Sequence, residues 1–168
     1  MPSGTKNSSM FDKTLALYQK LCLFLLYPPL ISMVTCFIGS FNDGYDYYLS
    51  LASERSLMMF LRENPIGSNV SMSMLLGDVV SIIVLALFVV LTIYASKGKV
   101  YCLAIGAALY LADTVYLCFL CGSSLPYSME AGSWGLQFAL HVIFFLLYVA
   151  SFFVYGKLLR LLKENRGH

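Results

Sequence analysis

Four long runs of apolar residues dominate this chain of 168 residues and leave few folds open to it. They cover residues 21–41, 74–95, 100–121 and 134–156. A helix needs about 20 mostly apolar residues to cross the hydrocarbon core of a bilayer, and each run is long enough. A transmembrane β-strand needs far fewer residues and alternates apolar with polar ones. The sequence therefore predicts an all-α fold: a polytopic membrane protein with four transmembrane helices in an antiparallel bundle.

The overall composition excludes the common soluble classes. Hydrophobic residues make up 59% of the chain and charged residues only 12%, whereas soluble domains have roughly 45–50% and about 25%. A small globule cannot bury so much apolar surface, because much of its chain lies at the boundary with water. The formal net charge of +2 is too small to indicate nucleic acid. The expected partner is the lipid bilayer, with a homo-oligomer or a larger membrane complex as further options.

The basic residues predict the orientation of the chain, because Lys and Arg accumulate on the cytoplasmic side of membrane spans. If both termini are cytoplasmic, nine of the 11 basic residues fall on that side: Lys6, Lys13, Lys20, Lys97, Lys99, Lys157, Arg160, Lys163 and Arg166. We therefore expect one transmembrane domain over residues 1–168 in the cell (plasma) membrane. Its cytoplasmic tails are residues 1–20 and 157–168, and its long outer loop is residues 42–73.

Two local features refine this picture. Pro28 and Pro29 lack backbone N–H groups, so a kink is expected in the first helix. In the outer loop, several apolar residues approximate a helical stripe, while the charged residues are expected mostly on other faces. The stripe consists of Leu49, Ala52, Leu57, Phe60 and Leu61, and the charged residues are Glu54, Arg55, Arg62 and Glu63. This pattern predicts a short interfacial helix that lies on the outer leaflet or caps the bundle.

Three side chains of the Asp, Glu, Lys, Arg or His type lie inside the predicted spans: Asp78, Asp113 and His141. A central Asp costs about 2.5–3.5 kcal/mol to insert into a membrane, so such residues face the bundle interior and are candidates for function. With a rise of about 1.5 Å per residue, they lie roughly 6, 12 and 10 Å from the outer ends of their helices. They are therefore expected in one layer.

Polar and aromatic neighbours extend this layer. Gln137 and Tyr148 share a helical face with His141, and Tyr110 and Tyr116 flank Asp113 at three residues on either side. If these faces meet, the second to fourth spans form an outward-facing polar pocket. The predicted pocket residues are Asp78, Asp113, His141, Gln137, Tyr110, Tyr116 and Tyr148.

The chemistry of this layer leaves three interpretations open. An Asp–His pair is suited to exchange a proton or to hold a cationic ligand. Two carboxylates and an imidazole could also bind a divalent metal, but the residues do not form a local metal motif, so we expect neither a metal nor another cofactor. The remaining interpretation is a network of hydrogen bonds that locks the helices together without a ligand.

Cys118 and Cys121 form a C-x-x-C pair, the pattern of thiol–disulfide exchange proteins. They are the candidates for redox chemistry. Quinone-coupled four-helix oxidoreductases have a second cysteine pair in an outer loop to relay electrons. Neither outer loop of this chain has one. Burial among apolar groups also blunts thiol reactivity. Small hydrophobic packing is therefore the preferred interpretation of both residues.

Residues 109–114 (Leu-Tyr-Leu-Ala-Asp-Thr) are followed by His141 in a last helix before a basic tail. This arrangement resembles uncharacterised small four-helix integral membrane proteins of Gram-positive bacteria, which implies a bacterial cytoplasmic membrane and no assigned activity. From the residues themselves we expect a transporter-like or accessory membrane subunit that binds a small ligand, proton or cation and is not an enzyme. The alternatives are a thiol-redox or metal-assisted membrane enzyme and a purely structural subunit.

Overall fold

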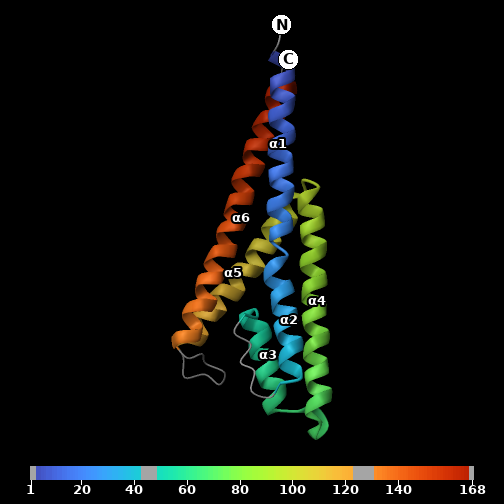
Figure 1. Cartoon of the computed structure of the whole chain (residues 1–168), viewed down its shortest axis with the longest axis vertical. Helices are drawn as coiled ribbons and strands as arrows, with labels where there is room; N and C mark the ends of the chain where they lie inside the picture. The colour runs from blue at the N-terminus through green and yellow to red at the C-terminus, as the bar shows by residue number, and fades with distance from the viewer. Residues whose placement is uncertain (1–2, 43–48, 123–130, 167–168) are drawn as a thin grey trace.

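A computed structural model describes residues 3–42, 49–122 and 131–166 (Figure 1). These ranges contain helices and no strand, so the all-α class expected from the sequence is confirmed. The elements are α1 (Ser3–Phe24), α2 (Tyr27–Ser40), α3 (Ala52–Glu63), the short 3-10 helix η1 (Ile66–Ser68), α4 (Val70–Ser96), α5 (Val100–Gly122) and α6 (Ala131–Arg166).

Four stretches of the described chain are long and apolar enough to cross a membrane. They are Ser9–Ser40, Val70–Ser96, Val100–Cys121 and Trp134–Glu164. Each overlaps one of the four predicted runs, so the number of candidate spans is confirmed. The first and last extend beyond the predicted runs, because much of both expected tails is helical and continues α1 and α6.

Pro28 and Pro29 divide the first candidate span into α1 and α2. At Leu25 and Leu26 the backbone N–H groups donate to carbonyls three residues back, both at 3.1 Å, in place of the usual four-residue spacing. Pro28 and Pro29 then lie in the first turn of α2. Prolines are favoured there because the first N–H groups of a helix have no partner within it. The expected kink is present as a break between two helices.

The two ends of the bundle are built differently. α1 packs along α6 and against α4, α5 packs against α4 and α6, and α2 packs against α4. Beyond the α4–α5 turn, α1 and α6 continue side by side to the two chain ends, and we call this part the stalk (Figure 1). At the other end, α3 contacts α2, α4 and α5.

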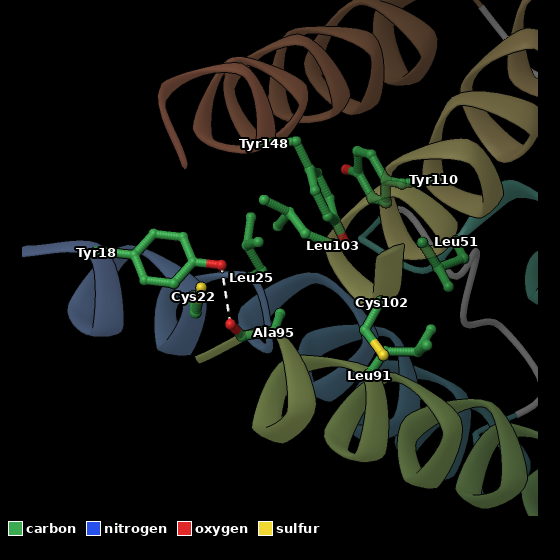
Figure 2. Packing of buried hydrophobic residues seen from close by; sticks show 10 residues of the cluster. All are labelled: Tyr18, Cys22, Leu25, Leu51, Leu91, Ala95, Cys102, Leu103, Tyr110 and Tyr148. Atoms are coloured by element: carbon green, nitrogen blue, oxygen red, sulfur yellow. Dashed lines mark hydrogen bonds between the residues drawn. The ribbon is translucent and has the colours of Figure 1, made fainter. Parts of the chain in front are cut away.

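An apolar cluster fills the middle of the bundle, where the stalk begins (Figure 2). The Tyr18 hydroxyl on α1 donates to the Ala95 carbonyl on α4 at 2.8 Å, and this bond ties α1 to the end of α4. The other members of the cluster are Cys22, Leu25, Leu51, Leu91, Cys102, Leu103, Tyr110 and Tyr148.

The buried face of α3 differs from the predicted apolar stripe. Leu49 and Phe60 are exposed, whereas Glu54 and Arg55 are buried. The helix itself is present, and its apolar stripe is divided: Ala52 and Leu61 are buried within the protein, whereas Leu49 and Phe60 are not. The reason is that polar side chains of neighbouring helices surround α3. A buried polar group is tolerated where it finds hydrogen bonds.

α3 approaches α4 closely at Gly77. A Cβ atom at this position would overlap Sδ of Met58, which is fully buried on α3. Met58 also packs with Cys36 of α2 and Met74 of α4. The absence of a side chain at Gly77 therefore lets α3 lie against α4.

We expect Gly77→Ala to lower the thermal stability of the protein in detergent. The helix gains about 1 kcal/mol in propensity from Gly to Ala, but the displaced Met58 costs about 1–3 kcal/mol in overpacking. Gly135→Ala on α6 is the matched control, because a Cβ there meets no atom within 4 Å. Melting followed by circular dichroism checks both variants. Equal melting temperatures for the two would contradict close packing at Gly77.

Candidate functional site

The first turn of α3 receives its caps from other helices. Leu51 at the N-cap offers no side-chain acceptor, although the first N–H groups of any helix need partners from outside it. The Leu51 N–H donates to Ser32 Oγ of α2 at 2.7 Å. The N–H groups of Ala52 and Ser53 donate to Asp113 Oδ2 and Oδ1 of α5, both at 2.9 Å. Ser53 Oγ also donates to Asp113 Oδ1, at 2.5 Å. Asp113 thus caps α3 from a different helix.

His141 on α6 completes the surroundings of Asp113. Its Nε2 lies 3.0 Å from Asp113 Oδ2, and its Nδ1 lies 2.9 Å from the Gln137 carbonyl oxygen. A carbonyl oxygen only accepts hydrogen bonds, so Nδ1 carries a proton. The Nε2–Oδ2 contact then needs a proton of its own, carried either by the imidazole or by the carboxyl group. The buried pair therefore holds one shared proton.

Two tyrosines and a glutamine hold this pair in place. The Tyr110 ring stacks on the His141 ring with centroids 5.2 Å apart and an interplanar angle of 18°. Tyr148 lies against Tyr110 at 5.8 Å, and both tyrosines are buried. The Gln137 amide Nε2 donates to the Ser50 carbonyl at 2.5 Å. α6 therefore also holds the segment that leads into α3.

A second carboxylate, Glu54, lies in the first turn of α3 and is only 3% exposed. Its Oε2 accepts a hydrogen bond from Ser32 Oγ at 2.7 Å and lies 3.7 Å from Cys36 Sγ. Oε1 has no hydrogen-bond partner within the described ranges. Burial raises the pKa of the Glu54 carboxyl, while hydrogen bonds from Ser32, Ser81 and Cys36 oppose that rise.

Asp78 belongs to a different contact, between α2 and α4. Ser40 Oγ donates to Asp78 Oδ1 at 2.8 Å, and the carboxylate is buried. Of the predicted pocket residues, the structure thus brings together Asp113, His141, Gln137, Tyr110 and Tyr148. The hydrogen bond of Asp78 is made with Ser40 on α2 instead.

Tyr116 and the two redox candidates lie outside the cluster. Tyr110 and Tyr116 are six residues apart on α5, so their side chains point about 120° away from each other. Only Tyr110 stacks on His141, and Tyr116 is 37% exposed. Cys118 is exposed and Cys121 half-buried, and both are free thiols.

The cluster leaves little open space. The cavity beside His141 has a volume of about 20 Å³, and a single water molecule needs roughly 10–15 Å³ by this measure. Tyr110, Gln137, Leu140 and Phe144 are among the residues that line it. Across the described ranges, no three His, Cys, Asp or Glu residues gather as a metal site would require. The closed site has room for a water molecule but not for a larger ligand.

Ser32, Ser53 and Glu54 belong to the site but were not predicted from the sequence. One signal was present: Ser32, Cys36 and Ser40 recur every four residues, which places them on one face of a helix. This small polar stripe in the first span indicates that the span faces polar partners. The sequence contains no comparable signal for the insertion of α3 between the helices.

No family model matches this chain, and no curated protein or solved structure matches it significantly. The geometry of the site is therefore the basis on which a function is inferred.

We expect Asp113 and His141 to contribute to stability as one unit. Each single change to Ala breaks the same buried contact, so the loss in the double variant will be smaller than the sum of the two single losses. Hydrogen bonds between membrane helices contribute about 0.6–1.7 kcal/mol, and the coupling free energy should fall in that range. The coupling free energy is measured by unfolding the wild type, the two single variants and the double variant in mixed micelles. Additive losses would contradict a direct interaction.

Glu54 should make the stability depend on pH. Its pKa in the folded protein lies above the ordinary value of 4.5, so the folded state holds this proton more tightly than the unfolded state does. The resulting stabilisation is complete below pH 4.5 and is lost as the pH rises through the folded pKa. In Glu54→Gln the melting temperature should therefore change less with pH between pH 4.5 and neutrality than it does in the wild type. Glu63→Gln, at an exposed position on the same helix, should show the same dependence of melting temperature on pH as the wild type. If Glu54→Gln also shows the wild-type dependence, the Glu54 carboxyl is not its source.

Proposed function

We propose that this chain is an integral protein of the cell membrane with both termini cytoplasmic, and that it acts as a transporter-like or accessory subunit rather than as an enzyme. Its spans form an antiparallel bundle. α3 occupies the outer half of this bundle, where the polar side chains described above contact it. The ligand of the polar cluster is a single proton, bound between Asp113 and His141 and coupled to the position of α3.

The distribution of apolar surface supports the membrane placement. Large apolar side chains are exposed along all four candidate spans, as at Phe37 on α2, Ile83 on α4, Phe119 on α5 and Phe153 on α6. In water so much exposed apolar surface would be costly. In lipid the same surface is matched to its surroundings, while the polar side chains find their partners inside the bundle.

One observation carries the choice of a proton among the ligands expected for this layer. His141 Nδ1 donates its hydrogen to the Gln137 carbonyl. A hydrogen bond between Nε2 and Asp113 Oδ2, which are 3.0 Å apart, therefore requires one further proton on either the imidazole or the carboxyl group. A proton also needs no additional space, whereas the cavity beside His141 has about 20 Å³. The proton is therefore the ligand that fits the closed site.

Loss of this proton would loosen α3. Two acceptors would then face each other across the Nε2–Oδ2 contact, and the Asp113 carboxylate would lose its compensating partner, which is destabilising for a buried pair. The groups that contact the pair are Tyr110 on α5, Gln137 on α6 and Ser53 on α3, and the Glu54 carboxyl lies close enough to interact electrostatically with Asp113. Because Asp113 also caps α3, a change in the pair alters the hold on that helix.

A cysteine placed at Ser56 tests this coupling. Ser56 is buried on α3, and its hydroxyl has no hydrogen-bond partner in the described part of the chain, so Cys is a mild replacement there. In a background without the native cysteines, we expect a membrane-impermeant maleimide to label Ser56→Cys in intact cells slowly at low pH and faster at high pH. With His141→Ala added, labelling should be fast throughout the pH range.

Two controls make the result interpretable. The exposed position Leu49, as Leu49→Cys, corrects for the pH dependence of the reagent itself. Lys99→Cys, in the turn between α4 and α5, should react only after the cells are opened. Labelling of this cysteine in intact cells would contradict the proposed orientation. If the corrected rate at Ser56→Cys is independent of pH and unchanged by His141→Ala, the cluster is a purely structural network.

A further inference from the structure

A groove lies on the surface of α6 at the level where the stalk begins. Its volume is about 600 Å³, and its lining residues are Val149, Phe152, Phe153, Gly156, Lys157 and Arg160. They recur at spacings of three and four, which places them along one face of the helix. The Tyr155 hydroxyl donates to the Gly98 carbonyl in the α4–α5 turn at 3.3 Å. The groove therefore lies level with the turn that contains Lys97 and Lys99.

The shape of the groove suits an alkyl chain. Gly156 leaves a gap in the helix surface, since a Cβ there would meet no atom within 4 Å. On one side of this gap lie Val149 and Phe152 together with Phe153, whose side chain is 77% exposed. These side chains form an apolar wall that runs from the gap toward the middle of the span.

The other end of the groove is positively charged. Lys157 and Arg160 are three residues apart on the same face, and none of the described residues that line the groove is acidic. Neither side chain forms an ion pair with the described part of the chain. A pair of cations next to an apolar wall is complementary to an anion that carries a hydrocarbon chain.

We infer that this groove binds an anionic phospholipid, with the phosphate at Lys157 and Arg160 and an acyl chain along Phe153 and Val149. The inference rests on the proposed membrane placement, which puts the α4–α5 turn at the cytoplasmic headgroups. Basic side chains at that level attract anionic lipids. A free phosphate ion would use the two cations but not the apolar wall.

Native mass spectrometry of the purified protein from micelles that contain equal amounts of phosphatidylglycerol and phosphatidylcholine tests the site. We expect the wild type to retain phosphatidylglycerol about thirtyfold better than phosphatidylcholine, from two cations at the headgroup level. Lys157→Gln/Arg160→Gln should abolish this preference. Lys13→Gln/Lys163→Gln removes the same charge at exposed positions outside the groove and should preserve it.

Two further arms identify the ligand. Gly156→Leu fills the gap and keeps both cations, so it should lower retention of phosphatidylglycerol; unchanged retention would overturn the acyl-chain assignment. Inorganic phosphate should not displace the lipid, and displacement would point to a simple anion site. An equal loss in both double variants would also overturn the inference.

Failure of the membrane placement has a separate readout. Extraction of cell membranes with alkaline carbonate should leave the wild type and all variants in the membrane pellet. Release of the wild type would contradict the proposed function itself. Retention of the wild type without a preference for phosphatidylglycerol would contradict only the lipid site.

Discussion

The capping of α3 by Asp113 is the interaction on which the arrangement of this protein depends. A helix that begins among other helices must find partners for its first N–H groups, because water is not there to supply them. The residue at the N-cap, Leu51, offers none, and the acceptors come from Asp113 on α5 and Ser32 on α2. The position of α3 is thus tied to the positions of both helices.

The same carboxylate connects this cap to α6. Asp113 Oδ2 accepts the Ala52 N–H and also contacts His141 Nε2, so one atom joins α3, α5 and α6. Gln137 adds a second connection through the Ser50 carbonyl, just before α3 begins. A change in the protonation of the His141 contact therefore bears directly on the cap. The proposed link between a proton and the position of α3 rests on this shared atom.

The sequence predicted this cluster in part. Asp113 and His141 stand out because ionisable groups are rare within apolar runs, and helical spacing placed Gln137 and Tyr148 beside His141. Spacing within one helix does not determine which helices are neighbours. Asp78 accordingly bonds to Ser40 on α2, and Tyr116 points away from His141. Glu54 was missed because a charged residue in a loop is ordinarily solvated, whereas its helix lies inside the bundle.

The all-helical class, the four candidate spans and the break at Pro28 and Pro29 could be predicted from the sequence, as could two ionisable groups of the cluster, Asp113 and His141. These follow from local properties: run length, missing backbone donors and the cost of burying charge. The position of α3 among α2, α4 and α5, with Glu54 buried and Asp113 at its first turn, could be seen only in the folded protein. The physical reason is that the caps and polar partners of α3 come from residues far away in the chain, and helical periodicity carries no information about such contacts.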